Sequence, residues 1–252
     1  MTLTGERTLP GIPEENYWFR RHEAAYLRLA RYCADAVVLE AGCGEGYGAA
    51  LLDRTADRVL ALDCDRATTR HVARRYPGLH TVRGDLAALP CGRSTIDVLA
   101  SLQVIEHLPD QPGFLAECAR ALRPGGRLLV TTPNRITFSP GRATPLNPFH
   151  TRELAAAELT DLLGRAGFTV QVLAGLHHGP RLRQLDLVHG GSVVDAQIAA
   201  ALDGRWPPHL LADVAAVRVE DFTVRDGDRN DDRDIDRDID ACLDLIAVAT
   251  AP

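Results

Sequence analysis

The chain has 252 residues, of which 46% are apolar and 25% charged, so it suits one globular domain and is too short for two full enzymatic domains. Its formal net charge of −6 excludes an overall basic surface for nucleic acid or an anionic membrane. Its six cysteines form no CxxC pair or zinc spacing, and it has no signal peptide or apolar run of about 18 residues. We therefore expect a cytoplasmic protein with reduced thiols, bound to neither nucleic acid nor membrane.

Residues 1–35 form an N-terminal segment in which we expect a helix from about Tyr17 to Cys33. The residues before it contain glycines and prolines, which disfavour regular structure. The helix opens with NYWFRRHEAAY, and its aromatic side chains have two interpretations. They dock the helix on the sheet, or they form a lid over a ligand, with Arg21 or His22 near an acidic group of that ligand.

An apolar run over residues 37–39 is typical of a buried strand in a parallel sheet. Glycines alternate after it, which permits tight turns and a close approach of backbone to a ligand before a helix over residues 49–54. These glycines are Gly42, Gly44, Gly46 and Gly48. The arrangement predicts a nucleotide-type site.

The kind of nucleotide depends on Glu40, at the end of this strand. Gly44, Gly46 and Ala49 also satisfy the loose dinucleotide fingerprint, and Asp63 follows at about the expected 20 residues. A carboxylate at position 40, however, would repel a pyrophosphate and suits the cationic amino group of a methionine moiety. The ExGxGxG pattern resembles motif I of the Rossmann-like S-adenosylmethionine-dependent methyltransferases.

Two further carboxylates follow predicted strands. Residues 59–62 form a strand that ends at Asp63, where the ligand crevice of a doubly wound sheet lies, so we expect Asp63 to bind both ribose hydroxyls. Asp65 can instead cap a helix over residues 66–75. After a strand over residues 80–83, the resemblance implies that Asp85 binds the adenine amine and that the amide of Leu86 faces the ring; a simple turn is the alternative.

A fourth strand, residues 96–101, runs into SLQVIEHLPD, which resembles motif IV of the family. In some branches ExxEH binds a divalent metal here, and a later histidine joins it. The resemblance implies a site made of Gln103, Glu106, His107 and His150, with Gln103 also beside the cofactor. Gln103 replaces a glutamate, which weakens a magnesium site, whereas manganese or zinc suits two imidazoles better. Alternatively, Glu106 and His107 orient the loop without metal.

The remaining elements complete a single α/β domain over residues 1–252. We expect Asp110 to cap a helix over residues 111–122, a strand over 127–132, and Thr151 to cap a helix over 152–165. Two last strands occupy residues 168–173 and 243–250. The resemblance implies a seven-stranded, Rossmann-like sheet in the order 3-2-1-4-5-7-6, with strand seven antiparallel.

Residues 174–242 form an insertion far longer than the usual joint of about 2–6 residues. We interpret it as a substrate-side cap in which Ser192 and Asp195 open a helix. His177, His178 and His189 are its candidate substrate ligands. The segment RDGDRNDDRDIDRDID, within residues 226–240, is predicted to be a solvated, mobile loop. It begins like a calcium loop but lacks the required glycine and glutamate, which excludes that function.

Longer strings, among them ENYWFRRH, EAGCGEGYG, NPFHTREL and HGGSVVDAQI, resemble an actinobacterial branch associated with methylglucose lipopolysaccharide biosynthesis. This resemblance implies methylation of a sugar hydroxyl in a polysaccharide or its oligosaccharide precursor. Such a hydroxyl is a poor nucleophile, so we expect His107, His150 and Glu106 to be catalytic. The alternatives are a small-molecule or quinone O-methyltransferase and a catalytically inactive regulator that binds the cofactor.

Overall fold

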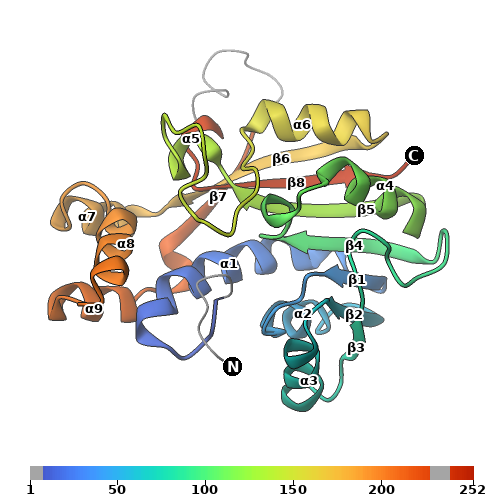
Figure 1. The fold of residues 1–252 in the computed structure, drawn as a ribbon, viewed down its shortest axis with the longest axis horizontal. Helices are drawn as coiled ribbons and strands as arrows, with labels where there is room; N and C mark the ends of the chain where they lie inside the picture. The colour runs from blue at the N-terminus through green and yellow to red at the C-terminus, as the bar shows by residue number, and fades with distance from the viewer. Residues whose placement is uncertain (1–7, 228–238) are drawn as a thin grey trace.

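The computed structural model describes residues 8–227 and 239–252, and its centre is one eight-stranded sheet (Figure 1). The strands are β1 (Val37–Ala41), β2 (Arg58–Asp63), β3 (His80–Arg83), β4 (Ile96–Leu102), β5 (Leu122–Pro133), β6 (Thr169–His178), β7 (Phe222–Asp226) and β8 (Asp244–Thr250). Their order is β3-β2-β1-β4-β5-β8-β6-β7. The first five pair in parallel, and β8 runs antiparallel to both β5 and β6.

Helices cover both faces of this sheet (Figure 1). They are α1 (Asn16–Leu29), α2 (Tyr47–Leu52), α3 (Arg66–Arg75), α4 (Gln111–Ala121), α5 (Arg135–Phe138), α6 (Ala156–Arg165), α7 (Pro180–Val188), α8 (Val193–Asp203) and α9 (Pro208–Ala215). Alternate residues of a strand point to opposite faces, so Val38 and Leu39 join different cores. One core includes residues of α1, α2 and α3, and the other includes residues of α4 and α6.

Three predicted helix starts are confirmed by their capping hydrogen bonds. Asp65 accepts from the backbone amides of Ala67 and Thr68, at 3.1 and 3.0 Å. Asp110 accepts from the amide of Gly113 at 2.9 Å, and Ser192 accepts from that of Asp195 at 3.0 Å. In each case a short polar side chain satisfies an amide that has no partner within the helix, which is a local effect that the sequence pattern reveals.

The predicted cap at Thr151 is wrong. Helix α6 begins at Ala156, where the Glu158 carboxylate accepts from the amide of Ala155 at 2.8 Å. The Thr151 hydroxyl instead donates to the backbone carbonyls of Glu106 and Leu108, at 3.0 and 2.8 Å. Residues 151–155 therefore fasten the loop after β4, a tertiary role that outweighs the local preference of threonine for a cap.

The sheet also differs from the expected seven strands. Strand β6 continues as far as His178, and β7, from within the predicted insertion, pairs antiparallel with its last residues. Strand β7 is therefore the additional strand, and it lies at the sheet edge beyond β6. The structure does not confirm the predicted seven-stranded arrangement. The predicted mobile loop and the rejected calcium loop fall mostly on residues 228–238, which lie outside the described residues.

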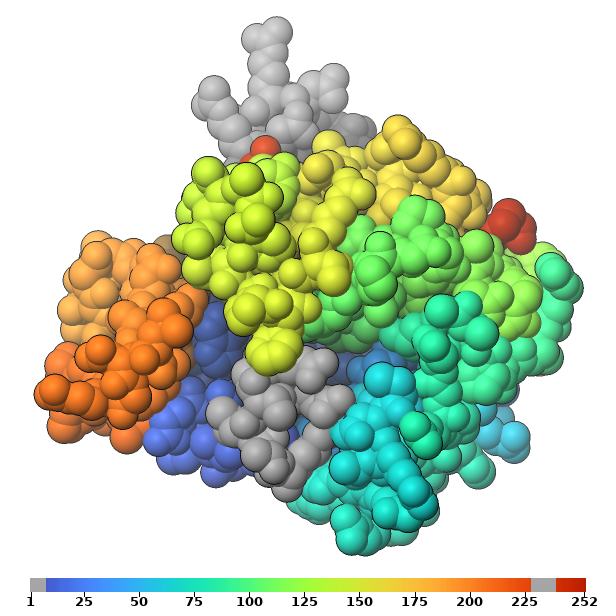
Figure 2. Space-filling model, viewed as in Figure 1, coloured from blue at the N-terminus to red at the C-terminus, as the bar shows by residue number. Residues whose placement is uncertain are grey.

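Helices α7, α8 and α9 form a lobe beside the N-terminal helix (Figures 1 and 2). The side-chain amide of Asn16 donates to the carbonyls of Val214, Ala215 and Val217, at 3.0, 3.1 and 2.8 Å. These bonds join the start of α1 to the end of α9. Within residues 8–227 and 239–252, no helix has the length and apolar character that crossing a membrane requires.

Candidate active site

The glycine loop turns back onto the end of β2. The amides of Gly42 and Cys43 both donate to the carbonyl of Leu62, at 2.9 and 2.8 Å. Gly42 has φ +85°, and a Cβ there would lie 2.7 Å from Cγ2 of Val104. A side chain at Gly48 would collide with the ring of Tyr26, 2.1 Å away. Gly42 is thus required by its positive φ, and Gly48 is required by the close packing of α1 on the loop.

Glu40 is fully buried at the end of β1. The Tyr26 hydroxyl donates to its Oε1 at 2.5 Å, whereas its Oε2 has no hydrogen-bond partner among the described residues. Burial raises the pKa of Glu40 to about 8, and hydrogen bonding to Tyr26 and to the backbone of Ala49 offsets only part of that effect. A buried carboxylate oxygen without a donor is an unsatisfied acceptor, and it fits the ammonium group of a methionine moiety.

Asp63 lies beside this loop, as predicted. Its Oδ2 accepts from the amide of Gly44 at 3.1 Å, and its Oδ1 accepts from the amide of Asp65 at 2.8 Å. Each carboxylate oxygen can accept more than one hydrogen bond, so ribose hydroxyls remain chemically compatible with this geometry. Asp85 lies exposed after β3 and accepts from the amide of Ala87 at 2.9 Å, with Leu86 half-buried beside it. Their ribose and adenine roles stay predictions.

Helix α1 touches the glycine loop, but not through Arg21. His22 Nδ1 lies 3.1 Å from the hydroxyl of Tyr47, the first residue of α2, and burial lowers the pKa of His22 to about 4. Arg21 is buried and donates two hydrogen bonds to Asp244, at 2.7 and 2.6 Å, and one to the carbonyl of Leu243 at 2.9 Å. The structure gives Arg21 a connecting role between α1 and β8 that the sequence did not predict.

Glu106, His107 and His150 come together at the carboxyl end of β4. One ligand atom from each lies within 4.8 Å of the others. Glu106 is buried, and Thr132 donates to its Oε2 at 3.0 Å. Burial raises the pKa of Glu106 to about 8. Gln103 lies just after β4, with φ +56° and its side-chain amide 3.3 Å from the Thr131 hydroxyl; its roles at the cofactor and the metal stay predictions.

The hydrogen bonds of the two histidines determine their tautomers. His107 Nδ1 lies 3.0 Å from the carbonyl of Phe149, which can only accept, so Nδ1 bears the proton and Nε2 the lone pair. His150 Nδ1 donates to the buried carboxylate of Glu153 at 2.7 Å, and its Nε2 accepts from the Asn147 amide at 3.2 Å. The carboxylate of Glu153 behind the imidazole fixes the orientation of the His150 ring.

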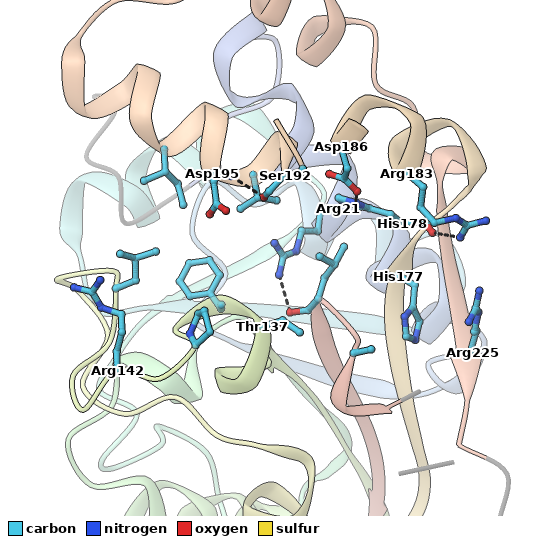
Figure 3. Close-up of a pocket in the computed structure, with 18 residues that line it drawn as sticks. Arg21, Thr137, Arg142, His177, His178, Arg183, Asp186, Ser192, Asp195 and Arg225 are labelled. Carbon is cyan, nitrogen blue, oxygen red and sulfur yellow. Dashed lines mark hydrogen bonds and ion pairs between the residues drawn. The ribbon is translucent and has the colours of Figure 1, made fainter. Parts of the chain in front are cut away.

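The three candidate substrate ligands of the insertion, His177, His178 and His189, lie in different surroundings. His177 and His178 line a cavity of about 770 Å³ (Figure 3). Both ring nitrogens of His178 have partners, the Tyr17 hydroxyl at 2.6 Å and Asp186 at 2.7 Å. His189 does not line this cavity. It lies 2.9 Å from Asp213 and stacks on His209, with ring centroids 5.5 Å apart.

Sequence reasoning missed several residues of these sites. Tyr26, Glu153 and Phe138 contact predicted site residues, and Phe138 packs on His150 with ring centroids 5.6 Å apart. The aromatic opening of α1 and the sequence FHTRE were visible signals. Neither signal indicates a partner, because the contacts join segments that are distant along the chain.

Comparison with known proteins shows the family to which the chain belongs. Residues 39–130 match the family described as "Methyltransferase domain". A probable S-adenosylmethionine-dependent methyltransferase of Mycolicibacterium smegmatis is 57% identical over 100% of this chain and 96% of its own length. One from Mycobacterium tuberculosis is 56% identical over 100% of this chain and 90% of its length.

More distant relatives share only part of the chain or only the fold. A ubiquinone biosynthesis O-methyltransferase of Parvibaculum lavamentivorans is 31% identical over 43% of this chain and 44% of its own length. A solved S-adenosylmethionine-dependent methyltransferase of Thermotoga maritima, titled a possible histamine N-methyltransferase, has a TM-score of 0.62. It is 17% identical and covers 93% of each chain, which shows a shared fold.

The chain therefore belongs to the S-adenosylmethionine-dependent methyltransferases, and it is a transferase with a Rossmann-like α/β fold. This membership sets aside the dinucleotide alternative for the glycine loop. The residues present fit the cofactor, because the loop permits close approach and Glu40 offers a buried acceptor.

We expect cofactor affinity to rise about tenfold per unit between about pH 6 and 7.5, because the cofactor's ammonium favours the ionised form of Glu40. The pKa of Glu40 is raised to about 8, so its ionised fraction grows throughout this window. Calorimetric titrations at several pH values measure the slope. The Glu40→Gln variant should bind more weakly and with little pH dependence; the same slope in that variant would assign the titration to another group.

Proposed function

We propose that this enzyme methylates a sugar hydroxyl of a polysaccharide or its oligosaccharide precursor, of the methylglucose lipopolysaccharide type. The observation that carries the proposal is the cluster of Glu106, His107 and His150, with Glu153 behind His150. A sugar hydroxyl loses its proton only at high pH, so its methylation requires a base or a metal beside the acceptor. An acceptor that is already acidic or basic would not need this cluster.

The cofactor supplies a methyl group on a positively charged sulfur. The residues of the chain align the acceptor oxygen and remove its proton. Holding two reactants in line contributes about 7–11 kcal/mol, and a positioned base contributes a further factor of about 10²–10⁴. His107 and His150 are the candidates for the second task, because each has Nδ1 bonded to an acceptor. His150 Nε2 also accepts from the Asn147 amide at 3.2 Å, so His150 acts as a base only when the acceptor hydroxyl takes the place of that amide.

We further propose that the same cluster holds a divalent metal. Glu106 provides a carboxylate, His107 and His150 provide imidazoles, and Gln103 is the candidate fourth ligand. This donor set suits manganese or zinc better than magnesium, which prefers oxygen ligands. The carboxylate of Glu153 would fix the orientation of His150 from behind, as such carboxylates do at metal-bound histidines.

The surroundings of the cluster favour a polar acceptor over a quinone. The neighbouring cavity is lined by arginine, histidine, aspartate, serine and threonine side chains, together with the apolar side chains of Phe138, Pro140, Leu146, Val194, Ile198, Ala241 and Leu243. Polar groups of this kind match sugar hydroxyls, whereas a quinone with an isoprenoid tail would need a mostly apolar lining. The likeness to the ubiquinone O-methyltransferase covers less than half of this chain, so it does not outweigh the lining.

The proposal is tested by incubating the purified protein with labelled S-adenosylmethionine and a panel of acceptors. The panel contains glucose oligosaccharides of several lengths, a catechol and a demethylated quinone precursor, each with and without chelator. We expect label in the oligosaccharides, and loss of activity with chelator that manganese restores. Label in the catechol or quinone alone would replace the proposed acceptor with a small molecule.

A further inference from the structure

The cavity beside the candidate active site has an unusual charge for this protein. It is lined by residues of α5 and the following loop, the end of β6, α7, α8, β7 and residues 241–243 (Figure 3). Its volume of about 770 Å³ lies within the range of about 300–1,000 Å³ that ligand pockets occupy. Although the chain has a net charge of −6, four arginines and only two aspartates line this cavity.

Part of this charge is already compensated. Arg21 is paired with Asp244, and Asp186 is paired with His178. Although burial opposes it, the hydrogen bonds from His178 and the amide of Val193 hold the pKa of Asp186 below its usual range. The Arg21–Asp244 pair therefore contributes little to the field inside the cavity, whereas Asp186 and Asp195 remain acidic groups of its lining.

Arg142 and Arg183 give the cavity cationic groups. Neither Arg142 nor Arg183 forms an ion pair with a described residue. Arg183 Nη1 donates to the carbonyl of His178 at 2.7 Å, which anchors the guanidinium at the cavity wall and leaves its other donors for a ligand. Figure 3 shows Arg183, Arg225 and His177 on one side of the cavity and Arg142 on the opposite side.

The cavity adjoins the candidate active site through one aromatic residue. Phe138 lines the cavity, and its ring packs on His150 with centroids 5.6 Å apart. His150 in turn lies edge-on to His107, with centroids 4.8 Å apart. The cavity and the two histidines are therefore neighbours, with the ring of Phe138 between them. The apolar side chains of Leu146, Val194 and Ile198 line the same space, where they can pack on the C–H face of a sugar ring.

We propose that this cavity binds an anionic group of the acceptor, a carboxylate or a phosphate, at the guanidinium of Arg183. The inference rests on the proposed function, since it adds a negative charge to the sugar acceptor. A guanidinium presents a planar fork of donors that matches both anions, and the hydrogen bonds it forms are stronger than neutral ones. The acceptor's reacting hydroxyl then lies toward His107 and His150.

The test compares three forms of one glucose trisaccharide: neutral, bearing a carboxylate at one end, and bearing a phosphate there. Binding is measured by calorimetry in the presence of the demethylated cofactor, so no methyl transfer is needed. We expect at least one anionic form to bind about tenfold more tightly than the neutral form, and added salt to reduce that preference. The two anionic arms show whether a carboxylate or a phosphate is preferred.

Variants of the cavity assign the effect to a residue. Arg183→Gln should remove most of the preference for the anionic form over the neutral trisaccharide. The control is Arg165→Gln on α6, because Arg165 is exposed and is not among the cavity's lining residues. Thermal melting of each variant confirms that it is folded.

The outcomes separate the inference from the function on which it rests. Equal binding of all three forms, with methylation of the neutral one, overturns the anionic subsite and keeps the sugar acceptor. A preference that survives Arg183→Gln also overturns it. If no trisaccharide binds but inorganic phosphate does, with loss in Arg183→Gln, the anionic subsite stands and the sugar acceptor fails.

Discussion

His150→Ala should lower kcat by about 10²–10⁴-fold while leaving cofactor affinity nearly unchanged, because it removes an imidazole positioned for proton transfer beside the acceptor. His150 is held by the buried carboxylate of Glu153 and lies in the cluster with Glu106 and His107. Single-turnover assays with labelled cofactor measure the rate, and calorimetry measures cofactor binding.

The pattern across the cluster distinguishes a metal site from a single base. Alanine at Glu106, His107 and His150 should each abolish activity if the three bind one metal, whereas a lone base should be sensitive mainly at one position. His80→Ala is the matched control, since His80 is an exposed histidine on β3. Full activity in the His107→Ala, His150→Ala double variant would rule out both the metal site and the single base, and only the alignment of the reactants would then account for catalysis.

Asp244→Ala should lower the free energy of unfolding by about 3–5 kcal/mol, because it leaves the charge of Arg21 buried without a partner. Both side chains are almost fully buried, with 2% and 1% exposed for Arg21 and Asp244. Urea denaturation followed by circular dichroism gives the difference.

The chain offers a matched control for this prediction. Arg28 and Asp226 form a second ion pair from α1, to the edge strand β7, but Asp226 is 58% exposed. Asp226→Ala should therefore cost less than about 1 kcal/mol, because water solvates the remaining arginine. Similar losses in both variants would show that burial of the Arg21 pair has no special effect.

The sequence determined the features of this protein that depend on neighbouring residues. The apolar run before Glu40, the glycines after it, and the caps at Asp65, Asp110 and Ser192 all act within a few residues. Such patterns predict strands, turns and helix starts, because the hydrogen bonds and backbone angles involved are local. These local patterns were enough to predict the glycine loop and the approximate positions of most strands.

Only the tertiary structure decided which distant side chains meet. The sequence suggested Arg21 or His22 near an acidic group of the cofactor, and it gave no sign that Arg21 binds Asp244, 223 positions away. Thr151 is a residue type that favours helix caps, but its hydroxyl instead donates to the backbone of Glu106, 45 positions earlier, and fixes that loop. Buried polar groups must find partners wherever packing brings them, and that requirement overrides a local preference worth about 1 kcal/mol. The partner of a buried charge is therefore a property of the whole fold, which a linear pattern does not contain.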